Sequence, residues 1–198
     1  SPMSRGLGDV YKRQEKPVKI ELNGEAVFYS TGSGKPAENA PTLVFVHGAG
    51  FDHSIWVMPA RYFARHGWRV VAVDLPGHGG SGGALLTSID QMADWVAQLI
   101  AAVSSDQQAS VVGHSMGSLI AMSCAARYPD HVAKIALLGT SAPMPVSDVL
   151  LNAAMDNDQA AVDMTNIWSH SAKGRLGSSE NPGPVSYTHL RAHETSEN

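Results

Sequence analysis

The pattern of apolar and polar residues changes its period several times along this chain, and each change predicts an element. Short runs that are almost wholly apolar are typical of strands covered on both faces in a parallel sheet. Two further runs joined by Asn23-Gly24 predict a tight hairpin, because both residues tolerate a positive φ. The predicted strands are residues 18–22, 26–29, 42–46, 69–73, 110–112 and 133–138.

Between these runs, apolar residues recur at spacings of three and four, which predicts helices with one face on the sheet. The clearest case places Ile89, Met92 and Val96 on one face, and Thr87 or Ser88 would cap its start. The predicted helices are residues 58–66, 88–103, 116–127 and 149–164, followed by a Gly- and Ser-rich loop over 168–184. Alternating strands and helices indicate an α/β fold with a doubly wound, mostly parallel sheet.

The two ends of the chain differ from its middle. Residues 1–14 and 185–198 show no apolar period and resemble peptides translated from sequencing-adapter DNA, so we expect foreign or disordered segments there. Residues 15–143 are predicted to form the core, incomplete at its carboxyl end. Residues 144–184 are predicted to begin a helical lid over the site.

Composition narrows the functional classes. The chain has 198 residues, of which 43% are hydrophobic and 16% charged, which fits one soluble globular domain. A net charge of −4 without a basic cluster argues against nucleic acid and against an anionic membrane surface. A lone cysteine, Cys124, forms no internal disulfide and lies in an Ala-rich run that favours core packing. We expect a cytoplasmic protein with a small-molecule substrate, and the pattern does not predict its oligomeric state.

The sequence Gly113-His114-Ser115-Met116-Gly117 lies between a predicted strand and a predicted helix. A serine hydroxyl is a weak nucleophile, so an enzyme must expose it, place a base beside it and supply donors to the oxyanion. A sharp strand-to-helix turn exposes the side chain, and the helix amino terminus adds a favourable dipole. A Gly-rich turn with a capping serine is the alternative, but it leaves the flanking strand and helix unexplained.

A second glycine-rich turn, His47-Gly48-Ala49-Gly50, follows the strand 42–46 at the same carboxyl edge of the sheet. A backbone N–H group presented there, together with that of Met116, would make a two-donor oxyanion hole. The run from Asp74 to Gly79 ends the next strand and would shape the pocket floor.

Four runs resemble the α/β-hydrolase superfamily, in particular the α/β-hydrolase-1 proteins: VFVHGAGFDHSIW, VVAVDLPGHGGSG, VVGHSMGSLIAM and IALLGTSAPMPV. The resemblance covers residues 18–184. It implies that Ser115 is the nucleophile, that Ala49 and Met116 supply the oxyanion-hole N–H groups, and that no cofactor or metal is needed. Serine in place of aspartate argues against the epoxide hydrolase and haloalkane dehalogenase branches. The residues expected to form the substrate pocket are His47, Gly48, Gly50, His114, Trp168 and His170.

The catalytic acid and histidine of the family follow the serine, each after a later strand. No such strand precedes the later candidates here. The pair His189 and His193 lies in the closing segment, and as a metal site it lacks a third ligand. We therefore expect both catalytic partners to be absent from this chain. The candidates considered and judged structural or exposed are His47, His53, His66, His78, His114, His131, Asp74, Asp148, Asp156, Asp158 and Asp163.

The expected function is hydrolysis of an ester or related acyl bond through an acyl-enzyme on Ser115 in the full-length protein, with the fragment itself inactive. A carbon–carbon bond hydrolase, a thioesterase, an acyltransferase and a cofactor-free haloperoxidase are alternatives on the same fold. A non-catalytic ligand-binding protein is the alternative from another class. The fragment alone would expose a sheet edge and could aggregate.

Overall fold

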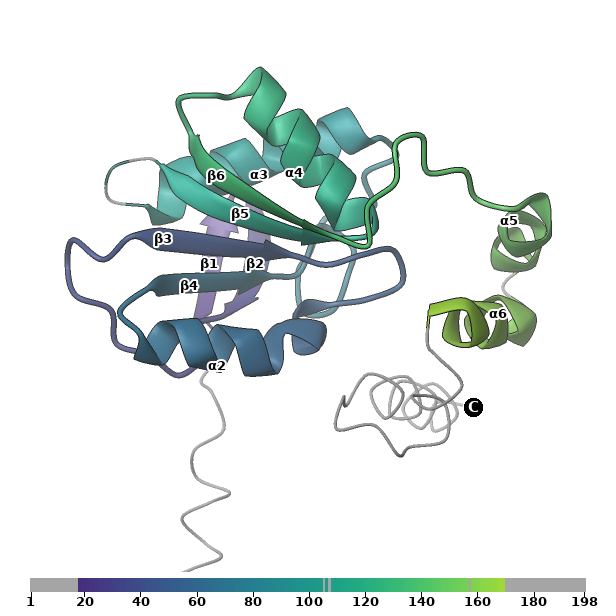
Figure 1. Cartoon of the computed structure of the whole chain (residues 1–198), viewed down its shortest axis with the longest axis horizontal. Helices are drawn as coiled ribbons and strands as arrows, with labels where there is room; N and C mark the ends of the chain where they lie inside the picture. Colours follow the sequence, from purple (N-terminus) through teal and green to yellow (C-terminus); the bar gives the residue numbers. More distant parts are fainter. Residues whose placement is uncertain (1–17, 105, 107, 157, 170–198) are drawn as a thin grey trace, which may run out of the picture. The chain divides into compact units, whose positions relative to one another are not determined.

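A computed structural model describes residues 18–104, 106, 108–156 and 158–169, which fall into two compact units that divide after Ala142. In the first unit, six strands form one sheet in the order β1-β2-β4-β3-β5-β6 (Figure 1). The strands are β1 (Val18–Leu22), β2 (Glu25–Ser30), β3 (Thr42–Val46), β4 (Arg69–Val73), β5 (Ala109–His114) and β6 (Val132–Leu138).

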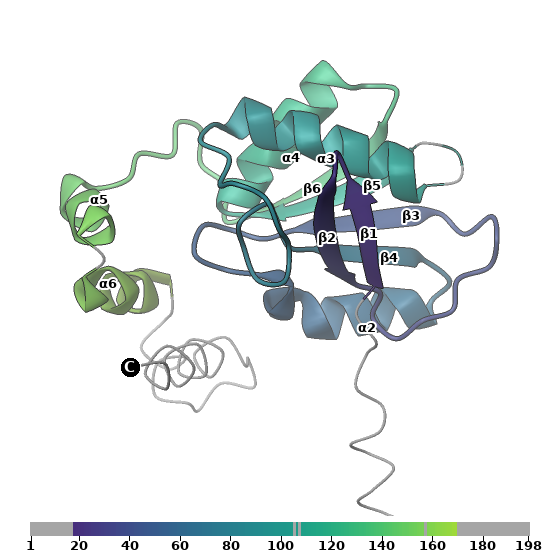
Figure 2. The same cartoon turned by 180° about the vertical axis from the view of Figure 1, so that it is seen from behind.

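The sheet is parallel except at its amino-terminal hairpin (Figure 2). Asn23 and Gly24 connect β1 to β2 with φ values of 56° and 83°, which confirms the predicted tight turn. The hairpin joins the parallel strands through β2, where Tyr29 lies opposite Val73 of β4. The four strands β4, β3, β5 and β6 therefore end at one edge, where the predicted site lies.

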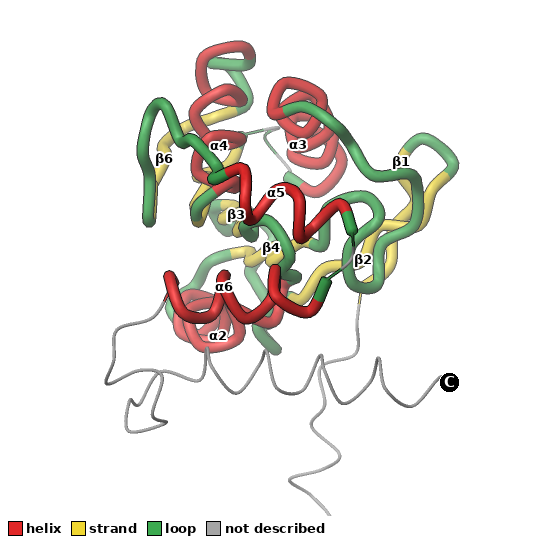
Figure 3. The backbone as a smooth tube through the Cα atoms, turned by 90° about the vertical axis from the view of Figure 1, so that its right-hand side faces the viewer, coloured by secondary structure: helices red, strands yellow, loops and turns green. Residues whose placement is uncertain are grey.

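Helices cover both faces of the sheet (Figures 1 and 3). Helices α3 (Ile89–Val103) and α4 (Met116–Arg127) pack on one face with Val44 and Val46. The 3-10 helix η1 (His53–Trp56) and helix α2 (Val57–Arg65) pack on the other with Leu43 and Phe45. Successive residues of β3 thus enter opposite cores, which explains why the strand is apolar after Thr42 and confirms the doubly wound fold.

The second unit corrects one prediction. Residues 149–164 are predicted to form a single helix, but the structure has two. Helix α5 (Asp148–Met155) ends inside that range, and helix α6 (Gln159–Ser169) begins after a break. The Asp158 carboxylate accepts a hydrogen bond from the Ala160 N–H group at 3.0 Å, as an amino-terminal cap does. Helix α6 continues to Ser169, so residues 168 and 169 are helical where a loop was predicted, and the rest of that prediction lies outside the described residues. No helix among the described residues is long and apolar enough to cross a membrane.

Strand β6 lies at the edge of the described sheet and is exposed along most of its length. Ile135, Leu137 and Leu138 are 41%, 39% and 43% exposed, whereas every residue of β3 is buried. β6 thus has the composition of an interior strand, but β5 is its one strand partner within the described residues.

Cys124 is fully buried in α4, which confirms the predicted core role. Burial raises the pKa of its thiol to about 11, so very little thiolate forms near neutral pH. We expect its reaction with Ellman's reagent at pH 8 to be slower than that of a free thiol by roughly a hundredfold or more. The same chain in denaturant serves as the control and should react at once. Rapid reaction in the native state would contradict the buried position.

Candidate active site

Ser115 forms the turn between β5 and α4 with φ 53° and ψ −120°. A positive φ is costly for a residue with a side chain, by roughly 1–3 kcal/mol, and such strain often occurs at functional sites. The turn is held from both sides. The Ser115 N–H group donates to the Leu138 carbonyl at 2.9 Å, and the Ser118 N–H and hydroxyl groups both donate to the Ser115 carbonyl. The backbone therefore has the geometry of a nucleophile elbow.

The two glycines of this motif are explained by how closely α4 approaches the strands. A Cβ atom on Gly113 would overlap the carbonyl of Gly117. One on Gly117 would overlap the carbonyl of Val46 and lie 2.6 Å from that of His47. Because these obstacles are backbone atoms, no side-chain movement relieves them. Glycine at both positions lets the helix begin directly over β3 and β5.

The loop after β3 passes beside Ser115. A Cβ atom on Gly48 would lie 3.1 Å from the Ser115 Cβ atom and 3.3 Å from the His114 Nδ1 atom. The next two residues, Ala49 and Gly50, are exposed, and Gly50 has a φ of 71°. Met116 begins α4 on the other side of Ser115. This proximity of the Ala49 loop to the elbow is what a two-donor oxyanion hole requires.

His47 fixes the start of this loop. It is fully buried, and its Nε2 atom accepts a hydrogen bond from the Leu75 N–H group at 3.1 Å. The proton must then be on Nδ1, which donates to the Gly48 carbonyl at 2.8 Å. Burial lowers the pKa of His47, so the ring is neutral at physiological pH. With both nitrogens engaged, His47 holds the loop in place.

Asp52, His53 and Asp74 form a cluster whose ligand atoms lie close enough together to hold a metal ion. The Asp52 carboxylate caps η1 by accepting from the Ser54 N–H group at 2.7 Å. His53 Nδ1 lies 2.8 Å from the Asp74 Oδ1 atom, which is a hydrogen-bond distance. Hydrogen bonding between loops accounts for this arrangement, and sequence reasoning did not find it.

The His53–Asp74 pair resembles the base and acid of a catalytic triad, but it lies over the wrong strands. Asp74 follows β4 and Ser115 follows β5, with β3 between them. The two strand ends are therefore two strand spacings apart, which together make about 10 Å. The His53 ring packs farther away still, at 4.7 Å between ring centroids from Phe28 of β2. His53 is therefore not positioned to take a proton from Ser115.

His114 precedes Ser115 in the chain and lies among aromatic rings. Its ring centroid is 5.9 Å from that of Phe51 and 6.5 Å from that of Trp56. The His114 Nδ1 and Trp56 Nε1 atoms are buried and have no hydrogen-bond partner among the described residues. Burial lowers the pKa of His114, so a neutral ring borders the Gly48 turn.

Three further predicted histidines of the first unit contact neighbouring residues. His66 stacks on Tyr62, and His131 packs beside Tyr128. The His78 Nδ1 atom lies 3.0 Å from the carbonyl oxygen of Pro76. Trp168 belongs to α6 in the second unit, and His170, His189 and His193 lie outside the described residues. The four later carboxylates, all exposed in the second unit, are Asp148, Asp156, Asp158 and Asp163.

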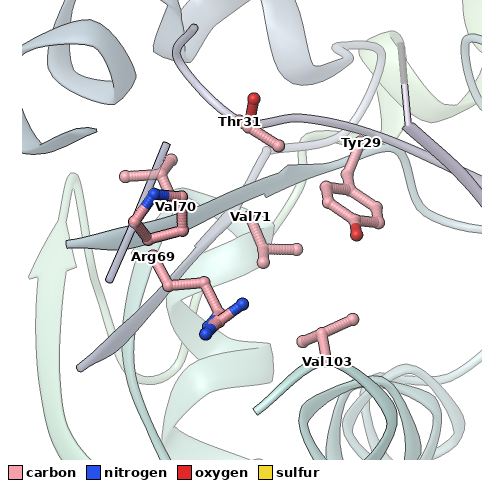
Figure 4. Close-up of a pocket in the computed structure, with 7 residues that line it drawn as sticks. Tyr29, Thr31, Arg69, Val70, Val71 and Val103 are labelled. Carbon is pink, nitrogen blue, oxygen red and sulfur yellow. The ribbon is translucent and has the colours of Figure 1, made fainter. Parts of the chain in front are cut away.

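A cavity of about 200 Å³ lies at the opposite end of the strands (Figure 4). Arg69, which begins β4, lines it together with Tyr29 and Val103. The Arg69 Nη2 group donates to the Glu38 carbonyl at 2.8 Å, so it is engaged by the preceding loop. Because Ser115 follows the carboxyl end of β5, this cavity is separate from Ser115.

Comparison with known proteins agrees with this geometry. A family model described as the alpha/beta hydrolase fold matches residues 41–194. The (E)-2-((N-methylformamido)methylene)succinate hydrolase of Acinetobacter baylyi is 32% identical over 124 residues, 62% of this chain and 44% of that protein. The pimeloyl-[acyl-carrier protein] methyl ester esterase of Chromobacterium violaceum is 44% identical over 101 residues, 51% of this chain and 37% of that protein.

Among solved structures, an N-acyl homoserine lactone degrading enzyme superposes with a TM-score of 0.70 at 24% identity, which shows likeness of fold. The alignment covers 90% of this chain and 65% of that structure, whereas the chain spans less than half of either relative above. The family match covers well over half of the chain and agrees with the sheet, the elbow and the glycine contacts, and this protein therefore belongs to the α/β-hydrolase fold family.

Proposed function

We propose that the complete protein is a serine hydrolase that cleaves an ester or related acyl bond through Ser115. The observation that carries this proposal is the strained elbow, because a serine with φ 53° on a strand-to-helix turn is costly without a function. The adjacent turn supports it, since Gly48, the residue before Ala49, lies beside the Ser115 side chain, as the loop of an oxyanion hole would.

The proposed reaction has two steps. The Ser115 Oγ atom forms a bond to the acyl carbon, its proton passes to a histidine, and the alcohol leaves with that proton as the carbon–oxygen bond breaks. The N–H groups of Ala49 and Met116 would stabilise the negative charge on the acyl oxygen in between. Water then attacks the acyl-enzyme, which releases the acid and restores the serine. Neither step needs a cofactor.

The relatives support the reaction class. One is named a hydrolase and the other a methyl ester esterase, and both align with part of this chain. We propose that the acid and the histidine lie outside residues 18–169. Within those residues, the described histidines have structural contacts and the later carboxylates are exposed. The proposed substrate is then a small acyl compound.

Covalent labelling of the complete protein with a fluorophosphonate tests the proposal. We expect stoichiometric labelling that Ser115→Ala abolishes, because phosphorus bonds to the activated Oγ atom and fluoride leaves. Ser123→Ala is the matched control, since Ser123 lies in the same helix and donates to Asp90 on the surface. Labelling that persists in Ser115→Ala would refute the assigned nucleophile. A folded wild type that binds ligands but is never labelled would favour the non-catalytic alternative.

A further inference from the structure

The Asp74 carboxylate joins two loops at the carboxyl edge of the sheet. It is fully buried and accepts three hydrogen bonds. The His53 N–H group and the His53 Nδ1 atom lie 2.7 and 2.8 Å from Oδ1, and the Gly80 N–H group lies 2.8 Å from Oδ2. The loop after β3 and the loop after β4 therefore meet at this one side chain.

The carboxylate is held in its charged form. Burial by itself would raise the pKa of Asp74, but the hydrogen bonds from His53 and Gly80 outweigh it and hold the pKa below its ordinary value. A charged group in a dry site keeps its donors in place, since any donor that leaves exposes an unpaired charge. Gly79 has no Cβ atom that would displace the carboxylate, and its φ is 51°. The Asp74 carboxylate is therefore closely packed against the loop after β4 as well.

The loop that passes Ser115 is consequently fixed at both ends. At its start, His47 accepts the hydrogen bond from the Leu75 N–H group, and at its end, His53 binds Asp74. Both anchors attach to consecutive residues after β4. The exposed residues Ala49 and Gly50 lie between the anchors, so the direction of their N–H groups depends on both.

We infer that His53 and Asp74 are positioning residues for the oxyanion hole. They do not contact the reacting atoms, and they act by holding the loop that presents the Ala49 N–H group. This inference rests on the proposed function of Ser115. It assigns the pair a role separate from the acid and histidine of a triad, because the pair lies over β4 and β2.

The test compares three variants in the complete protein. His53→Leu removes the side-chain donor, whereas His53→Asn keeps an N–H donor near the position of Nδ1. His66→Leu is the matched control, because His66 is an exposed histidine with an Nδ1 contact to a backbone carbonyl at the far end of α2. For p-nitrophenyl esters, we expect His53→Leu to lower kcat by roughly 10- to 100-fold, less than the full loss of an oxyanion donor. KM should stay within about twofold, and Asn should restore most of kcat.

A second readout does not depend on turnover. Amide hydrogen exchange in the 198-residue chain should accelerate by about tenfold or more at residues 48–52 in His53→Leu, with β5 and α3 unchanged. A kcat for His53→Leu equal to that of the control, or an Asn variant no better than Leu, would overturn the inference while leaving the serine mechanism intact. An active wild type that keeps its activity as Ser115→Ala would overturn the proposed function itself. Uniformly faster exchange would show a general structural role and also overturn the inference.

Discussion

Hydrolysis of p-nitrophenyl acetate by the 198-residue chain is expected to be on the order of a million-fold slower than by a serine hydrolase with a complete triad. Ser115 can attack only when an imidazole takes its proton. His47 has both nitrogens engaged, and His53 is held by Asp74 away from the nucleophile. The elbow and the neighbouring loop can still orient a bound ester, so some residual rate is expected.

The initial rate of the 198-residue chain minus that of its Ser115→Ala variant gives the part of the hydrolysis rate that depends on Ser115. A high rate that Ser115→Ala removes would contradict the expectation. If His193→Ala also removed that rate, the base would be in the closing segment of this chain, and our interpretation of residues 185–198 would be wrong.

Replacement of Gly117 by alanine is expected to destabilise the fold by about 3 kcal/mol or more, at the upper end of what overpacking costs. Alanine in a helix interior is otherwise favoured over glycine by about 1 kcal/mol, so intrinsic propensity predicts the opposite sign. Contacts decide between the two effects. The new Cβ atom would meet the backbone carbonyls of Val46 and His47, which belong to the central strand and the loop after it.

Thermal unfolding followed by circular dichroism measures this difference. The matched control is Gly67→Ala, where the added Cβ atom meets nothing within 4 Å and the cost is that of a positive φ alone, roughly 1–2 kcal/mol. A Gly117→Ala chain as stable as the Gly67→Ala chain would show that α4 is free to move off the sheet, and the steric explanation of the motif would fail.

The elements that the sequence predicts well are those with strong local signals. Strand 42–46 and helix 116–127 have the predicted bounds, because an unbroken apolar run and an Ala-rich run next to glycine leave little choice. The Asn23-Gly24 turn is equally local. The break between α5 and α6 coincides with four consecutive polar residues, 156–159, and the prediction of one helix joined the apolar residues on either side of them across this interruption and its Asp158 cap.

The candidate site divides in the same way. The elbow can be predicted because its two glycines and its serine lie within five consecutive residues, whose conformation depends on one crossing of helix and strand. The His53–Asp74 pair cannot, because it joins residues 21 apart whose contact depends on the neighbouring ends of β3 and β4. Parallel strands end at one edge of a sheet, which places Asp74 near the loop after β3. This rule does not select His53 from the other histidines.

The backbone of Ser115 is tied to the exposed edge of the sheet. The Ser115 N–H group bonds to the carbonyl of Leu138, the last residue of β6, and that strand has one neighbour among the described residues. Edge strands fray more readily than central ones, since fewer contacts must break. Each fraying event at the end of β6 would release one of the bonds that hold the strained turn. Whatever covers this edge would therefore also determine how long the serine stays in its strained geometry.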